Sequence, residues 1–130
     1  MRDLKSNITV GNSILPQSLT AAANGTGIDL QGTDRAAVVF HAGATGGTTP
    51  SFTFAVQESD DNSTYTDVAA TDLQGTPPVV TTTNTGVTVI GYLGSKRYIR
   101  AIAKTVTGTS PTLLASASVI ETSLNIRGGV

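Results

Sequence analysis

The chain has 130 residues, 13% charged side chains, a formal net charge of −1 and no cysteine. The charged fraction is about half of the usual ~25%, and proteins that bind duplex nucleic acid normally carry a basic excess, so nucleic acid is not an expected partner. No apolar run approaches the ~18–20 residues of a membrane span, and the lack of cysteine excludes a disulfide framework.

The first third of the chain contains short apolar segments separated by turn residues. Residues 8–10 and 27–30 are predicted as short strands, and residues 17–23 between them are the one helix candidate. Residues 36–42 (AAVVFHA) form an apolar run typical of a central strand. Residues 43–50 (GATGGTTP) are rich in glycine and threonine, which predicts an exposed loop.

A hairpin is predicted over residues 52–68, at the centre of the β-sandwich. Phe52, Phe54 and Val56 alternate with polar or small residues, which is the period of a half-buried strand. Residues 59–63 (SDDNS) form a turn, because Asp and Asn side chains accept hydrogen bonds from nearby backbone N–H groups. The returning strand then covers residues 64–68.

The second half of the chain continues the pattern of strand and turn. Residues 71–78 contain two prolines, which lack the ladder donor, and so predict a loop. Strands are predicted at 87–93, 98–106 and 113–120, with a loop at 107–111. β-Branched residues are frequent in all of these segments and fit a pleated strand better than a helix.

About eight strands of this kind predict an all-β fold, a single β-sandwich of jelly-roll type. We expect one domain over residues 1–130, with short arms at 1–5 and 122–130. Ile99 and Ile102 have opposite parity, so one of them is expected to face a different sheet or an interface. The predicted core consists of Val38, Phe40, Phe52, Phe54, Val56, Val89, Ile99, Ile102 and Leu114.

Residues for catalysis or metal binding are sparse. The single histidine, His41, lies within a predicted strand, and no serine is flanked by the G-x-S-x-G pattern of a nucleophile elbow. One histidine without cysteine cannot supply a zinc site, and Asp60 and Asp61 lack the spacing and the glycine of a calcium loop. We therefore expect no enzymatic activity, no catalytic residue, no cofactor and no bound metal.

Charge is unevenly distributed along the chain, with acids gathered in the predicted hairpin and bases near the C-terminal strands. One interpretation is ordinary surface charge. The other is an interface in which the basic segment meets the acidic hairpin of a neighbouring copy or an acidic partner. The candidate interface residues are Lys96, Arg97, Arg100, Lys104, Arg127, Glu58, Asp60 and Asp61.

Three stretches resemble small proteins encoded in the structural-gene blocks of tailed bacteriophages and prophages. They are 5–10 (KSNITV) leading to 20–32, 54–68 (FAVQESDDNSTYTDV) and 91–100 (GYLGSKRYIR). The resemblance implies a non-enzymatic virion structural protein, a capsid decoration or cement protein that binds the major capsid protein. It also implies a location on the capsid surface, and in the host cytoplasm during assembly.

Two alternatives stay open. Residues 58–68 (ESDDNSTYTDV) also resemble a hairpin of jelly-roll sugar-binding modules, with Tyr65 where those modules have tryptophan. This implies a carbohydrate-binding module on the virion, with a host glycan as partner. A head–tail connector or another tail component of the same virion is the second alternative.

Assembly follows from the low charge content. Lysine and other charged residues normally protect sheet edges against pairing with another chain, and this chain has few of them. A closed symmetric oligomer is the usual way to cover such edges. We therefore expect a homo-oligomer, a dimer or a trimer, held by the arms and one sheet edge.

Overall fold

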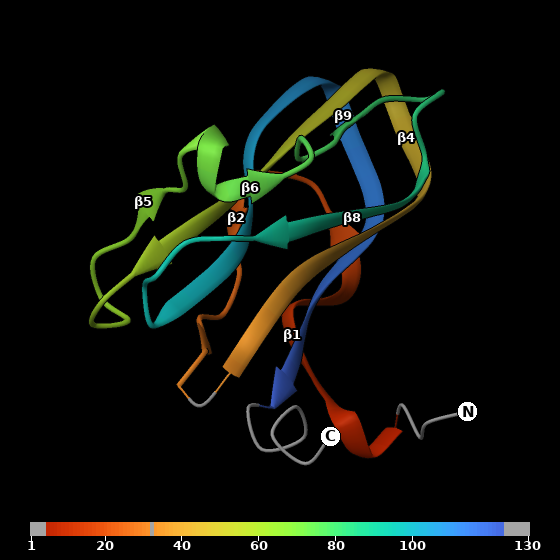
Figure 1. Cartoon of the computed structure of the whole chain (residues 1–130). Coiled ribbons are helices and arrows are strands. Elements are labelled where there is room, and N and C mark those ends of the chain that lie inside the picture. Colours follow the sequence, from red (N-terminus) through yellow and green to blue (C-terminus); the bar gives the residue numbers. More distant parts are fainter. Residues whose placement is uncertain (1–4, 32, 124–130) are drawn as a thin grey trace.

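The computed structural model describes residues 5–31 and 33–123, and the remaining parts of the predicted arms lie outside these ranges. Over the described residues, nine strands form one antiparallel sheet (Figure 1). One short 3-10 helix, η1 (Lys5–Asn7), precedes the first strand, and a second, η2 (Ala70–Asp72), lies between β5 and β6. The predicted all-β class is confirmed.

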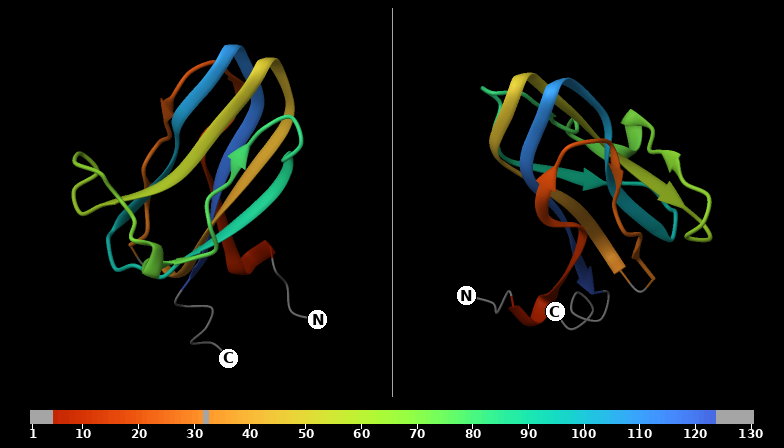
Figure 2. Two further views of the ribbon diagram at one scale, coloured as in Figure 1. Left: turned by 90° about the horizontal axis from the view of Figure 1, so that it is seen from above. Right: turned by 180° about the vertical axis from the view of Figure 1, so that it is seen from behind.

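Two long strands organise the sheet. β4 (Thr33–Ser59) and β9 (Tyr98–Ser123) pair with each other in antiparallel fashion from end to end. Both strands bend at the same end of the molecule, so the sheet folds over itself into two facing layers (Figure 2). The register shifts repeatedly between Ala42 and Ser51, and Gly47 and Gly108 take positive φ angles of 91° and 114°. Such bulges and glycines increase the local bend of a strand.

The predicted loops at 43–50 and 107–111 are therefore wrong. Both segments are strand, and they pair with each other through Thr48 and Thr109. Pro50, which was expected in an exposed loop, is buried. Residues 43–50 have the glycine-rich composition that is typical of a loop. In this structure the glycines instead allow two paired strands to bend.

The first layer has the order β1–β9–β4–β8–β6, where β4 and β9 contribute residues 33–42 and 112–123. β1 (Ile8–Leu19) pairs with β9, β8 (Gly86–Tyr92) pairs with β4, and β6 (Leu73–Gln74) pairs with β8. The helix predicted at 17–23 is wrong, because Gln17 to Leu19 continue β1 opposite β9. Pairing with a neighbouring strand here overrides the helix propensity of the alanines that follow.

The second layer contains the other halves of the two long strands, residues 51–59 and 98–107. β2 (Ala23–Asn24) and β3 (Ile28–Asp29) lie beside β9. β5 (Thr66–Asp67) and β7 (Val79–Val80) lie beside β4.

The hairpin turn predicted between β4 and β5 is confirmed by the pairing of Gln57 with Asp67 and of Glu58 with Thr66. The first arm of the hairpin is central as predicted, since it lies between β9 and the short strands β5 and β7. The returning strand is two residues long and lies at the margin, so the central position is wrong for this arm. The jelly-roll prediction is not confirmed, since the two layers are halves of one sheet.

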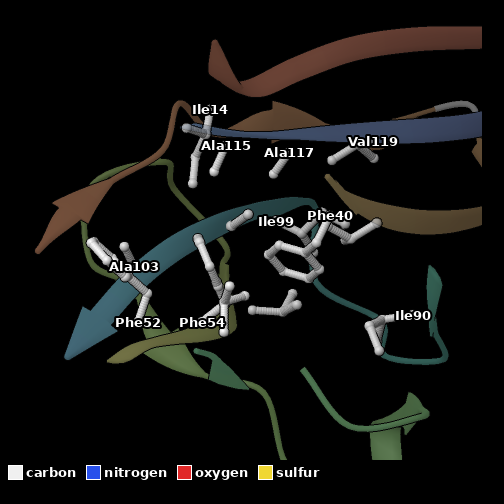
Figure 3. Packing of buried hydrophobic residues seen from close by; sticks show 14 of the residues in the cluster. Ile14, Phe40, Phe52, Phe54, Ile90, Ile99, Ala103, Ala115, Ala117 and Val119 are labelled. Atoms are coloured by element: carbon white, nitrogen blue, oxygen red, sulfur yellow. The ribbon is translucent and has the colours of Figure 1, made fainter. Parts of the chain in front are cut away.

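The hydrophobic core lies between the layers (Figure 3). Seven of the nine predicted core residues are buried, whereas Val89 and Leu114 are 59% and 55% exposed. Their neighbours Ile90 and Leu113 point inward instead. Because strand side chains alternate between faces, an error of one residue reverses the assignment.

Ile99 and Ile102 differ as the parity predicts. Both are buried, but Ile99 belongs to the core cluster and Ile102 does not. Ile102 lies on the opposite side of β9, where Asn24 and Ala55 flank it on the neighbouring strands.

Candidate interaction surface

The basic and acidic residues of the candidate interface meet within one chain. Lys96 Nζ lies 2.8 Å from Asp60 Oδ2, and Lys104 Nζ forms an ion pair with Asp67. All four side chains are well exposed. Exposed ion pairs of this kind contribute little to stability, because water screens them and the long side chains lose entropy. The charge complementarity noted in the sequence is therefore met within one chain, between the hairpin and residues 96–104.

Arg97 is paired in a more directional way. Its Nε and Nη2 atoms donate to Asp29 Oδ1 and Oδ2 at 3.0 and 2.9 Å, which links the start of β9 to β3. The two parallel hydrogen bonds hold the pKa of the Asp29 carboxyl below its usual value. Asp29 was not among the candidates, since the two residues lie far apart in the sequence.

Asp61 forms the turn of the hairpin. Its Oδ1 accepts hydrogen bonds from the backbone N–H groups of Ser63 and Thr64, each at 3.0 Å, and from the Ser59 hydroxyl at 2.9 Å. These bonds lower the pKa of the Asp61 carboxyl. The carboxylate is thus occupied by its own turn. Among the described residues, no group of three or more His, Asp or Glu side chains is placed to hold a metal ion.

Arg100 lies on the outer face of the second layer, over the ring of Tyr65. Its Cζ is 4.0 Å from the ring centroid, and its Nε and Nη2 atoms donate to Gln57 Oε1 at 3.0 and 2.7 Å. Gln57 in turn donates to Asp67 at 2.9 Å. The Tyr65 hydroxyl donates to Asn62 Oδ1. Both one face of the ring and the hydroxyl of this tyrosine therefore have partners within the chain.

Glu58 forms a hydrogen bond with Tyr92, the last residue of β8. The buried Tyr92 donates its hydroxyl proton to Glu58 Oε1 at 2.8 Å, and the backbone N–H of Lys96 donates to the same hydroxyl at 3.2 Å. Burial, together with the bond to Glu58, raises the pKa of Tyr92 well above its ordinary value. This contact connects β4, β8 and the loop that leads into β9.

A polar cleft of about 460 Å³ opens beside these groups, between the start of β4 and the 93–97 loop. Its charged lining residues are Arg35, Asp60, Lys96 and Arg97. Seven of the eight candidates thus lie on the hairpin, on the 93–97 loop or on the part of β9 that pairs with β4 in the second layer, and we call this region the charged surface. Arg127 lies outside the described residues. Sequence reasoning missed Asp29, Gln57 and Tyr92, which have partners only once the strand register is known.

Comparisons with known proteins bear on the fold. No family model matches the chain, and no curated protein matches it. The crystal structure of the SPBc2 prophage-derived protein YomS is similar, with a TM-score of 0.53 and 17% sequence identity over 90% of this chain and 94% of that chain. At this identity the likeness shows a shared fold.

In the described part of the chain, no helix has the length and apolar character to cross a membrane.

Proposed function

We propose that the protein is a structural component of a tailed-phage virion, and that it decorates the head as a capsid decoration or cement protein. The observation that carries the proposal is the fold shared with a prophage-derived protein across nearly the whole of both chains. The three sequence stretches that resemble phage structural proteins point in the same direction.

The physical character of the fold supports a role in binding rather than in catalysis. A protein that binds a shell loses less entropy on binding when its body is already stiff. Here two long paired strands run through both layers, and none of the described buried side-chain polar atoms lacks a hydrogen-bond partner. A capsid lattice repeats each contact many times, so a modest interface gains by avidity.

The major capsid protein is the proposed partner, and the charged surface is the proposed contact. The ion pairs Lys96–Asp60 and Lys104–Asp67 are exposed, so exchanging them for partners on the shell carries a small cost. Charges of this kind orient an encounter and fix its register more than they add affinity.

The carbohydrate-binding alternative depends on the Tyr65 ring as a platform for a sugar. Arg100 covers one face of that ring, and the ring hydroxyl is engaged with Asn62. Both contacts argue against this alternative. A glycan array with a reproducible signal that Tyr65→Ala abolishes would restore it.

The test is to add the purified protein to heads of its own phage assembled without it, followed by electron microscopy of the particles. We expect saturable binding at symmetric positions on the outer shell, and greater resistance of the heads to heating. Density at the portal or along the tail would replace the decoration proposal with the connector or tail alternative. Absence of binding to any particle would contradict a virion role.

A further inference from the structure

The outer side of the first layer lacks formal charge over a broad area. Among the described residues, its outward side chains are aliphatic, small or neutral polar, with Arg35 at one end. We call this surface the neutral face. It consists of Val87, Val89 and Gly91 on β8, Ala37, Val39 and His41 on β4, Ser116, Ser118 and Ile120 on β9, and Val10 and Asn12 on β1.

The neutral face has a hollow on each side of a central row of three side chains. The row consists of Val89, Val39 and Ser118, and Val39 is only 9% exposed although it points outward, so its neighbours cover most of it. On one side of this row, a hollow of about 440 Å³ is lined by residues that include Arg35, Ala37 and Gly91. On the other side, a second hollow of about 370 Å³ is lined by residues that include His41, Leu114 and Ser116.

Most edges of the sheet are poorly suited to pairing with another copy. β1, the long edge strand of the first layer, contains Pro16 and register shifts on both sides of Ile14. Bulges and proline are features that prevent an edge from pairing with another strand. The marginal strands β2, β3, β5, β6 and β7 are each two residues long. β6 pairs with β8 only at Gly91 and Tyr92, so the open edge of β8 is limited to residues 86–90.

From these observations we infer that the neutral face binds the neutral face of a second copy, in a two-fold symmetric dimer. A charge buried without a partner is costly, so the surface that covers the neutral face must itself be neutral. The outer side of the second layer carries Arg100, Lys104 and Asp67 and does not meet this condition. A two-fold axis brings identical patches together, so the neutral face of each copy covers that of the other.

The size of the face sets the strength of the dimer. Four strands at ~4.8 Å and seven paired rows at ~3.3 Å give roughly 19 by 23 Å, on the order of 440 Å² of flat area per copy. Stable complexes bury about 800 Å² per partner, so this interface is about half that size and in the range of weak, transient contacts. We therefore expect a dimer with a micromolar or weaker dissociation constant. The inference concerns the free protein and does not depend on the proposed function.

The test is sedimentation equilibrium of the full chain from micromolar to millimolar concentration. Val89→Lys places a charge on the neutral face, and Val79→Lys is the matched control, since Val79 is an exposed valine (46%) on a strand of the second layer. We expect concentration-dependent dimerisation of the wild type, a loss of affinity of at least about tenfold in Val89→Lys, and little change in Val79→Lys. Added salt should leave the dimer intact, because no ion pair is involved.

A monomer at millimolar concentration would overturn the inference, as would equal effects of the two lysine variants. If Val89→Lys fails to fold, Val87→Lys makes the same test at a side chain that is 63% exposed. The two-fold geometry has a separate readout because the chain contains no cysteine. Ser118→Cys should form an intermolecular disulfide on oxidation, while Thr53→Cys on the second layer should not; the reverse result would place the contact elsewhere.

Discussion

Phe40 and Phe54 belong to the same strand, yet their ring centroids lie 5.4 Å apart, with the ring planes inclined by 50°. This contact exists because β4 bends between the two residues and brings its own halves into opposite layers (Figure 2). The two rings meet in the core between these layers (Figure 3). The core is therefore closed by the bend, and each ring contributes both its buried area and a tilted aromatic contact.

The first prediction concerns this aromatic contact. Phe54 is 4% exposed, so Phe54→Ala should lower the free energy of unfolding by ~3–5 kcal/mol through lost burial and the cavity that remains. Urea unfolding measures the change. Val89→Ala, at an exposed position, is the control and should change stability by less than ~0.5 kcal/mol. A loss below ~1 kcal/mol in Phe54→Ala would mean that the ring faces solvent.

A second prediction concerns Ser13, a buried polar residue on β1. Its hydroxyl accepts a hydrogen bond from the Ala101 N–H and donates one to the Thr26 carbonyl, both at 2.9 Å. Ser13→Ala leaves a buried donor without a partner and should destabilise the fold by ~1–3 kcal/mol. Ser18→Ala on the same strand, at an exposed position, should have almost no effect. Equal stabilities of the two variants in thermal unfolding would exclude this role for Ser13.

The third prediction tests the bend. Gly108 has a φ of 114°, and a Cβ at this position would lie 2.7 Å from the Thr49 carbonyl oxygen. Gly86 has a similar φ of 127°, with nothing within 4 Å of the same atom. Both Gly→Ala variants have the backbone penalty of a left-handed conformation, but Gly108→Ala adds a clash and should lose ~1–3 kcal/mol more. Similar midpoints in urea would show that the bend relaxes to accept a side chain.

How much of this fold could be predicted depends on the local pattern. Phe52, Phe54 and Val56 alternate with small or polar residues, so their inward orientation follows directly from the sequence. Residues 87–93 are apolar on both faces, because one side packs in the core while the other belongs to the neutral face. This pattern does not show which of the two alternating sets of side chains points into the core. For this reason Val89 was predicted as a core residue, whereas Ile90 is the one that is buried.

The bend and the charge pairing could not be predicted from the sequence. Residues 43–50 have the composition of a loop, and their pairing with β9 is a long-range contact that no local pattern records. Asp29 and Arg97 are 68 positions apart, and Gln57 and Arg100 are 43 apart. The charges themselves were recognisable, but the choice between a partner in the same chain and one in a neighbour depends on the register of β4 against β9.

The fourth prediction concerns acid stability. Hydrogen bonds to the Asp61 carboxylate lower its pKa below 3.8, the ordinary value, so the folded state binds its proton less readily than the unfolded chain does. The resulting stability is present above the unfolded pKa and is lost as the pH falls through the folded value. Asp61→Asn keeps an acceptor oxygen at every pH, so its stability should decline less steeply below about pH 4. Parallel curves for the two proteins in urea titrations would contradict this assignment.

The last prediction depends on the proposed function. It tests whether Lys96 and Asp60 matter only for their ion pair within the chain or also for binding to the phage head. Lys96→Glu should weaken head binding with little change in stability, because the pair with Asp60 is exposed. The double variant Lys96→Glu, Asp60→Lys restores an ion pair within the chain but reverses the positions of the two charges that a partner meets. We expect the double variant to unfold at the wild-type midpoint and still to bind heads poorly in co-sedimentation. If the double variant binds heads as well as the wild type does, the shell contacts another surface. In that case the positions of these two charges do not matter to the partner.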